Sequence, residues 1–185
     1  MQDYHEFMDE VLVDEKTIEK RVYELSAQIS RDYAGQELLV VCLLRGGMTF
    51  TADLTRFLVI PHTLDCMSLS SYGFGHYSSS GNVRVNLDLM TNIEGLNVLL
   101  VEDIVDSGRT LAHVLQMLKT RDPKSLKVCV LLDKKYRREV PVEVNYVGFD
   151  VPDKYVFGYG IDIDEHYRNL RFIASADMQK YKKMH

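Results

Sequence analysis

The stretch VLLVEDIVDSGRTL, residues 98–111, decides the fold of this chain. It begins with four consecutive apolar residues, which is typical of a strand buried on both faces. A polar turn that contains Gly108 follows, and apolar residues then recur at helical spacing from about residue 110 to residue 120. The stretch therefore predicts a strand, a turn and a helix in that order.

The same order of elements recurs nearer the N-terminus. Residues 38–44 (LLVVCLL) form a second apolar run, which Arg45, Gly46 and Gly47 separate from a helical pattern that extends to residue 58. Buried strands that alternate with helices predict an α/β fold with a mainly parallel, twisted sheet flanked by helices. In such sheets ligands collect at the carboxyl ends of the strands.

The remaining pattern is consistent with this layer structure. An amphipathic helix is predicted over residues 14–32, because apolar side chains recur there at a period near 3.6. Its buried stripe is Ile18, Val22, Leu25 and Ile29, and Gly35 is a candidate terminator. Further strands are expected at residues 126–132, 144–151 and 172–176.

Composition limits the classes of protein to consider. A chain of 185 residues with 46% hydrophobic content is expected to form one domain over residues 1–185. No apolar run approaches the roughly 20 residues that cross a bilayer, and the N-terminus is too acidic for a signal peptide, so we expect a soluble, cytoplasmic protein without a membrane partner. The net charge of −5 argues against a nucleic-acid partner.

The three cysteines give no sign of a metal or redox site. Cys42, Cys66 and Cys129 each lie in an apolar stretch, and none belongs to a CxxC pair. They are expected to be free, buried thiols. The six histidines form no HxH or HExxH pattern, and His113 is expected at the surface or its boundary.

The turn after residue 101 carries groups suited to a phosphorylated ligand. Gly108 permits close approach of a ligand, and the hydroxyls of Ser107 and Thr110 join the free N–H groups of the following helix as donors to a phosphate monoester. The acids Glu102, Asp103 and Asp106 must serve another part of the ligand: sugar hydroxyls, a metal ion or a proton being transferred. The stretch has neither the GxxxxGK[ST] nor the GxGxxG pattern.

This stretch resembles the phosphoribosyl-pyrophosphate (PRPP) motif of type I phosphoribosyltransferases: an apolar strand, Glu-Asp, two apolar residues, then Asp-[Ser/Thr]-Gly-x-Thr. The resemblance covers nearly the whole chain and is weakest over about the first thirty residues. It implies the type I phosphoribosyltransferase fold with a small hood lobe built from both chain ends, and a homodimer or homotetramer. The segments similar to the hypoxanthine-guanine branch are LLRGG (43–47), SSYG (70–73), LLDK (131–134), VPDKYVFGY (151–159) and Asp162 with Tyr167-Arg168.

The resemblance implies roles for the donor half of a site. The loop from Asp106 to Thr110 would hold the 5′-phosphate, Glu102 and Asp103 would face the ribose hydroxyls partly through Mg²⁺, and Asp162 would face a second Mg²⁺. Asp106 would lie near N7 of the purine as general base or hydrogen-bond acceptor. Arg45-Gly46 resembles the family's pyrophosphate loop, which often contains a cis peptide. The implied PRPP-binding set is Arg45, Gly46, Glu102, Asp103, Asp106, Ser107, Gly108, Arg109, Thr110 and Arg168.

For the purine, the resemblance implies that Lys134 donates to the 6-oxo group, that Tyr155 stacks on the ring and that Val156 presents backbone groups. The neighbouring Lys135, Arg137 and Arg138 are expected to be ordinary solvated charges. Residues 68–82 are too polar to pack as core and predict a long surface loop, which is either an exposed connection or a lid. The pair Ser71-Tyr72 resembles the family's mobile closure loop and favours the lid.

Three functions follow from these patterns. The first is an enzyme that makes IMP, GMP or both from PRPP and a 6-oxopurine, with Mg²⁺ as cofactor. The second is an RNA-binding regulator on the same fold, which the acidic net charge and the VPDKYV segment disfavour. The third is another nucleotide-binding α/β protein such as a reductase, against which the missing dinucleotide glycines count. The preference among hypoxanthine, guanine and xanthine stays open.

Overall fold

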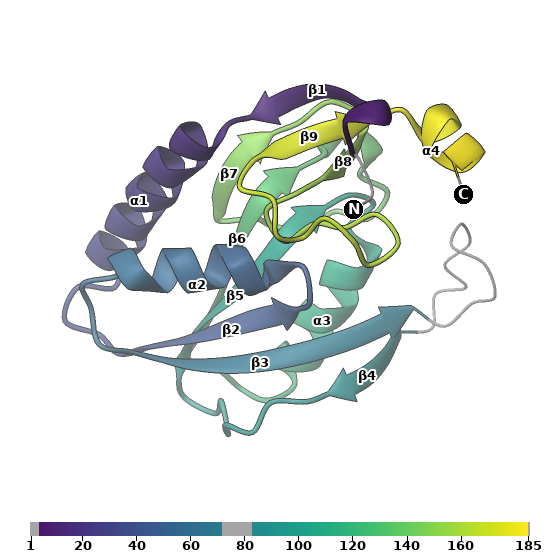
Figure 1. Cartoon of the computed structure of the whole chain (residues 1–185). Coiled ribbons are helices and arrows are strands. Elements are labelled where there is room, and N and C mark those ends of the chain that lie inside the picture. The colour runs from purple at the N-terminus through teal and green to yellow at the C-terminus, as the bar shows by residue number, and fades with distance from the viewer. Residues whose placement is uncertain (1–3, 72–82, 185) are drawn as a thin grey trace.

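The computed structural model describes residues 4–71 and 83–184, in which the strands form two sheets (Figure 1). The larger sheet has the strand order β4-β3-β2-β5-β6-β7. All neighbours in it pair in parallel except β3 and β4, which are antiparallel. Its strands are β2 (Leu38–Leu44), β3 (His62–Ser71), β4 (Val83–Leu87), β5 (Asn97–Val105), β6 (Ser125–Asp133) and β7 (Tyr146–Asp150).

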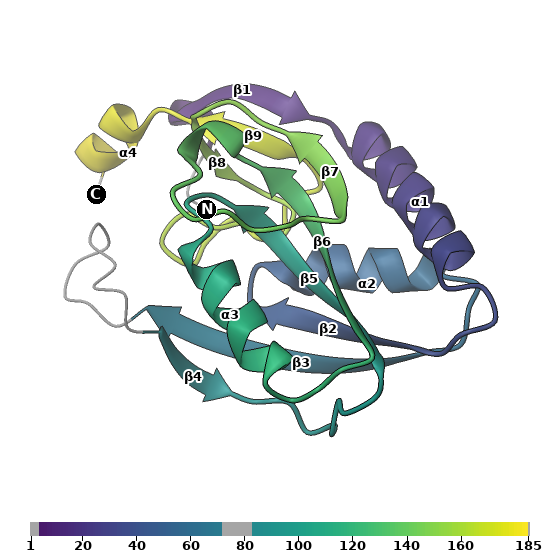
Figure 2. The same cartoon turned by 180° about the vertical axis from the view of Figure 1, so that it is seen from behind.

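Helices cover both faces of this sheet. The helices α1 (Glu15–Asp32) and α2 (Gly47–Phe57) lie on one face, and α3 (Arg109–Lys119) lies on the other, as the reverse view in Figure 2 shows. Successive side chains of a strand point to opposite faces, so Leu38 and Val40 join the core under α1 and α2, while Leu39 and Val41 join the core under α3. Burial on both faces explains why these strands read as continuous apolar runs.

A small antiparallel sheet, of order β1-β9-β8, lies over the end of the large sheet (Figure 1). It consists of β1 (Met8–Val13), β8 (Tyr155–Phe157) and β9 (Ile173–Ala176), and the short helix α4 (Met178–Met184) follows it. Phe7, Phe157 and Tyr181 pack in its core with ring centroids 5.0–5.4 Å apart. Segments from the two ends of the chain thus form this small sheet.

Most of the expected elements are confirmed. The N-terminal helix runs from Glu15 to Asp32 behind an N-cap at Asp14, whose carboxylate accepts a hydrogen bond from the Thr17 N–H at 2.9 Å. Strand β2 has the expected bounds, and β6, β7 and β9 lie within two residues of theirs. No helix in the described part of the chain is long and apolar enough to cross a membrane.

Two expectations about strand ends were wrong. Strand β5 continues to Val105, because its ladder with β6 extends to the Val105–Asp133 pair, so Glu102 and Asp103 lie in the strand and not in the turn. Residues 68–71 belong to β3, where they pair with β4, and are not part of a loop. The rest of the expected loop, residues 72–82, lies outside the described residues. The short or polar strands β1, β3, β4 and β8 were not expected.

Candidate active site

The carboxyl ends of three neighbouring strands bring the candidate site together. Arg45 follows β2, Asp106 follows β5 and Lys134 follows β6. The N–H of Lys134 donates to the Val105 carbonyl at 2.9 Å, which joins the ends of β5 and β6. Residues far apart in sequence therefore meet at one edge of the sheet, as expected for a parallel α/β fold.

The phosphate loop, residues 106–110, is shaped by backbone contacts. Gly108 has φ +82°, and a Cβ on it would lie 2.6 Å from the Val140 carbonyl oxygen, so only glycine fits. The Ser107 carbonyl accepts hydrogen bonds from the N–H groups of Glu139 at 2.9 Å and Val140 at 3.0 Å. Helix α3 begins within this loop, at Arg109, and the N–H groups of its first turn point away from the helix as anion donors.

The acidic pair Glu102 and Asp103 lies beside the loop after β2. A Cβ on Gly46 would come within 1.7 Å of Asp103 Oδ2, so the absence of a side chain at Gly46 lets this carboxylate pack against the backbone. Burial, together with the neighbouring Asp103 carboxylate, raises the pKa of Glu102 well above its usual value. A divalent cation would relieve this repulsion, and carboxylate oxygens are ligands that Mg²⁺ prefers, so the pair fits a Mg²⁺ ion.

Asp106 lies at the junction between the phosphate loop and the end of β6. Lys134 Nζ is 3.9 Å from its Oδ2, and Arg137 Nε is 3.0 Å from its Oδ1. The buried Oδ1 nevertheless accepts no hydrogen bond from any described residue, because the Arg137 N–H is not aligned with it. Oδ1 is thus an anionic acceptor with a cation nearby and its hydrogen-bonding capacity unused.

Lys134 is buried, with 7% of its surface exposed. Burial lowers its pKa, and the nearby Asp106 carboxylate opposes that effect. A buried ammonium next to a carboxylate is a strong hydrogen-bond donor to any neutral acceptor that enters the site.

The neighbouring basic residues are not all ordinary surface charges. The expectation of a solvated residue is wrong for Arg138, which forms a buried ion pair with Asp133 and packs its Cδ against Gly108. It is incomplete for Arg137, which bridges Asp106 and, at 3.1 Å, Asp153. Only Lys135 behaves as expected, because it is 60% exposed and pairs with Asp150 at 2.9 Å.

The two other residues expected at the purine lie at the start of β8. Tyr155 is 43% exposed, and Val156 is buried beside it in the core under α1 and α2. The ion pair between Arg137 and Asp153, two residues before Tyr155, connects this segment to Asp106. The Arg137–Asp153 ion pair therefore links the segment that carries the exposed Tyr155 to Asp106.

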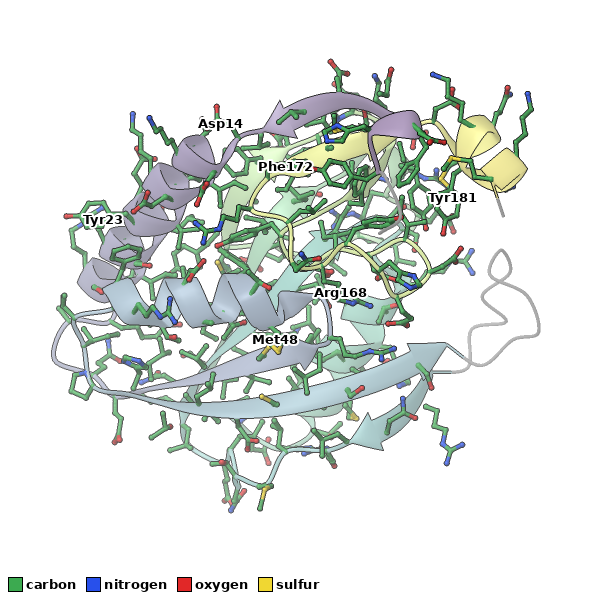
Figure 3. The ribbon with its side chains drawn as sticks, viewed as in Figure 1. Asp14, Tyr23, Met48, Arg168, Phe172 and Tyr181 are labelled. Carbon is green, nitrogen blue, oxygen red and sulfur yellow. The ribbon has the colours of Figure 1, made fainter. Side chains whose placement is uncertain are left out.

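Arg45 and Arg168 come from two segments that meet at Gly46 and Gly160. The peptide bond between Leu44 and Arg45 is cis. Arg168 donates to the Gly160 carbonyl at 2.8 Å and pairs with Asp162 at 2.7 Å. Figure 3 shows Arg168 between the N-terminal end of α2, marked by Met48, and the small sheet. Gly160 fits closely here, since a Cβ on it would lie 2.3 Å from the Gly46 carbonyl oxygen.

The residues suggested as metal ligands do not form one cluster. In the part of the chain that the structure describes, no group of three or more His, Cys, Asp or Glu side chains is arranged to hold a metal ion. Asp162 pairs with Arg168 and accepts a hydrogen bond from the Glu165 N–H at 2.8 Å, and neither contact involves Glu102 or Asp103. Of the two residues named for the lid, Ser71 is the last residue of β3, and Tyr72 lies outside the described residues.

Sequence reasoning missed three charged residues of this cluster: Arg137, Asp153 and Glu165. Glu165 pairs with Arg45 at 2.5 Å and with Arg168 at 3.0 Å. A charge run such as KKYRR suggests a solvated surface. Only the acidic partners Asp106 and Asp153, which are distant from it in sequence, show that Arg137 points toward the site. The position of Arg137 four residues after the last residue of a buried strand was the one available signal.

Comparisons with known proteins agree with this geometry. The family described as phosphoribosyl transferase domain matches residues 10–166. A hypoxanthine phosphoribosyltransferase of Salmonella typhimurium is 48% identical over 169 residues, which cover 90% of this chain and 94% of the relative. A hypoxanthine-guanine phosphoribosyltransferase of Dictyostelium discoideum is 46% identical over 178 residues, which cover 94% and 98%. The crystal structure of a hypoxanthine phosphoribosyltransferase from Staphylococcus aureus matches with a TM-score of 0.91 at 39% identity, over 96% of each chain.

The matched family region includes most of the candidate site. The phosphate loop, Lys134 and Asp162 lie within residues 10–166, and Arg168 lies two residues beyond. The relatives extend the similarity over nearly the whole chain. The chain therefore belongs to the phosphoribosyltransferase family, within the group that contains hypoxanthine and hypoxanthine-guanine phosphoribosyltransferases.

Proposed function

We propose that this protein transfers the 5-phosphoribosyl group from PRPP to N9 of hypoxanthine, guanine or both, and gives IMP or GMP and pyrophosphate. The relatives named for this activity support the assignment, because they align over 90% or more of the chain. The observation that carries it is the position of Asp106, the first residue of the phosphate loop and the contact point of Lys134 and Arg137. The part of the site that binds PRPP, the phosphoribosyl donor, and the part that binds the purine, the acceptor, meet at this carboxylate.

In the donor half, the 5′-phosphate of PRPP binds the first turn of α3 and the backbone of residues 106–110, with the hydroxyls of Ser107 and Thr110 as further donors. The exposed side chain of Arg109, paired with Glu139 at 2.7 Å, contributes positive charge at the rim. Because a preformed turn pays little entropy on binding, this loop positions the ribose for reaction.

In the acceptor half, Lys134 donates to the 6-oxo oxygen, Tyr155 stacks on the ring and Val156 offers backbone groups to its edge. The burial of Lys134 and the exposed ring of Tyr155 support these roles. A 6-amino group would present hydrogens to the Lys134 ammonium and leave a buried donor unpaired, so the site disfavours adenine.

Transfer then needs one proton acceptor. As N9 of the purine forms its bond to the anomeric carbon, the bond from that carbon to the pyrophosphate oxygen breaks, and the N7 proton passes to the Asp106 carboxylate. The same carboxylate stabilises positive charge that develops on the ribose. The Asp106 side chain is 44% exposed, which supports access of the purine to this carboxylate.

Arg45 and Arg168 absorb the charge that develops on the leaving pyrophosphate, and the Gly46 backbone approaches the same group. Glu102 and Asp103 would hold one Mg²⁺ and Asp162 a second. Bound Mg²⁺ supplies positive charge to the diphosphate oxygens. A cytoplasmic location, assembly as a homodimer or homotetramer, and closure by a lid that contains Ser71 and Tyr72 are proposed on the family resemblance.

The test is to incubate the protein with Mg²⁺, PRPP and each of hypoxanthine, guanine, xanthine, adenine and uracil, and to measure nucleotide and pyrophosphate together. We expect equal amounts of the two products with hypoxanthine or guanine and little with adenine or uracil. The absence of turnover with every purine would refute the proposal. A salt-dependent RNA-binding assay on the same preparation tests the regulator alternative.

A further inference from the structure

Glu165 places one carboxylate between two arginines that come from distant parts of the chain. Its Oε1 lies 2.5 Å from an Arg45 guanidinium nitrogen, and its Oε2 lies 3.0 Å from an Arg168 guanidinium nitrogen. Arg45 follows β2, whereas Arg168 lies in the segment between β8 and β9. The carboxylate therefore stands between two cations, where an anion with several oxygens would also bind.

The backbone around Glu165 turns sharply to present this side chain. Four residues other than glycine in this segment have positive φ: Tyr159 at +50°, Asp164 at +48°, Glu165 at +69° and Tyr167 at +70°. Such conformations are sparsely populated, and they persist where the surrounding structure holds them. Here the Glu165 N–H donates to Asp162, and the Arg168 and Gly160 backbones bond to each other.

The two ion pairs are suited to exchange with a ligand. Arg45 and Glu165 have side chains that are 66% and 55% exposed, and ion pairs in contact with water are weak and easily replaced. Arg168 is better anchored, since it also holds the Gly160 carbonyl and Asp162. Loss of Glu165 would thus leave Arg168 in place and free both guanidinium groups for another anion.

We propose that Glu165 is an internal competitor for pyrophosphate, whose carboxylate occupies the space between Arg45 and Arg168 until the diphosphate displaces it. The inference rests on the proposed function, which assigns those arginines to the pyrophosphate group of PRPP. Displacement lowers the affinity for pyrophosphate, and return of the carboxylate favours its release after transfer. Glu165 thereby determines how tightly the diphosphate binds while making no contact with the purine or the 5′-phosphate.

A positioning role for Glu165 predicts the opposite effect. If the carboxylate served to hold the arginines in place, its removal would leave them less ordered and weaken the binding of pyrophosphate. If the carboxylate competes, its removal strengthens that binding. The sign of the change separates the two roles.

The experiment is calorimetric titration of the full chain with pyrophosphate at saturating Mg²⁺, for the wild type, Glu165→Gln and Glu15→Gln. Glutamine keeps the size of the side chain and removes its charge. Glu15 is the matched control, because it is 56% exposed and its ion pair, with Arg171 at 2.9 Å, involves neither Arg45 nor Arg168. Since each exposed ion pair changes an equilibrium constant by up to about fivefold and Glu165 forms two, Glu165→Gln should bind pyrophosphate about 3- to 25-fold more tightly, and Glu15→Gln should match the wild type.

A second measurement tests whether the effect of Glu165→Gln is limited to ligands that carry the diphosphate. The Michaelis constant for PRPP should fall in Glu165→Gln, while the affinity for IMP, which lacks the diphosphate, and the Michaelis constant for hypoxanthine should stay at their wild-type values. Unchanged or weaker pyrophosphate binding in Glu165→Gln, with a wild type that binds pyrophosphate and turns over, would overturn this inference alone. A wild type that neither binds pyrophosphate nor consumes PRPP would overturn the proposed function as well.

Discussion

The phosphate loop is held by backbone atoms, whereas the arginine pair, Arg45 and Arg168, is held largely by side chains. In the loop, glycine geometry and hydrogen bonds from residues 139 and 140 fix the shape before any ligand arrives. At the arginine pair, three ion pairs with Asp162 and Glu165 set the arrangement, and two of them involve the exposed Glu165 carboxylate. The phosphate loop, which is the fixed half of the site, suits the phosphate that stays on the product. The arginine pair, which is the exchangeable half, suits the diphosphate that must leave.

Among the changes that compare the phosphate loop with the arginine pair, the largest effect is expected from Gly108→Ala, which breaks the phosphate loop. The added Cβ would meet the Val140 carbonyl oxygen at 2.6 Å in a residue with φ +82°, so the loop must move. A displacement of about 1 Å in such a loop costs about 100-fold in rate, and we expect kcat/KM for PRPP to fall by at least about that factor. Steady-state kinetics with varied PRPP measures it.

Gly95→Ala is the control for this change. Gly95 also has positive φ, +71°, but a Cβ there would meet no described atom within 4 Å. The variant should lose some thermal stability and keep its activity. If both variants lost activity equally, backbone strain in general would explain the loss, and the contact of Gly108 with Val140 would not.

A smaller effect is expected at Lys134, which extends the fixed half toward the purine. Lys134→Gln removes a buried charge, and a hydrogen bond from a charged group contributes about 1.5–3 kcal/mol, so kcat/KM for hypoxanthine should fall about 10- to 100-fold at neutral pH. Burial lowers the pKa of Lys134, so the ammonium loses its proton below the ordinary lysine pKa of 10.5. The ratio of kcat/KM for hypoxanthine between the wild type and Lys134→Gln should therefore fall as the pH rises toward that value.

The measurement is the ratio of wild-type to variant kcat/KM across the alkaline range, because ionisation of the purine itself cancels in that ratio. A constant ratio up to pH values above the ordinary lysine range would contradict the role of the Lys134 ammonium as donor.

The smallest effect is expected at Arg109, the one arginine within the phosphate loop. Its side chain is 49% exposed and pairs with the exposed Glu139, whereas the loop itself is built from backbone donors. Arg109→Met should raise the Michaelis constant for PRPP less than about fivefold, in the range expected for an exposed charge. A loss as large as that of Gly108→Ala would mean that both halves of the site depend on side-chain charge.

The sequence predicts the two halves unequally. The loop after β5 is readable because glycine, hydroxyl and acidic residues follow a buried strand at fixed spacing, and the contacts that shape it are local. The arginine pair depends on Glu165, which is 120 residues from Arg45, and an exposed acid in a polar segment gives no local signal. Arg138 was taken for a surface residue for the same reason, since its buried partner Asp133 reads as a strand-end acid.

The limits of strands were also set by tertiary contacts. Residues 102–105 look like a turn, because acids are rare in strands, but pairing with β6 keeps them extended. This extension places Asp103 against Gly46 and brings the acidic pair beside the loop after β2. Pattern reasoning identified these residues and could not locate them relative to one another.

The most direct test of the account is Asp106→Asn, measured for turnover and for PRPP binding in the same preparation. Asparagine keeps the shape of the loop and cannot accept the N7 proton, so kcat should fall about 100- to 10,000-fold, while the dissociation constant for PRPP with Mg²⁺ stays within about threefold of the wild type. Equal losses in both quantities would show that Asp106 shapes the loop and does not take the proton, and would contradict the account.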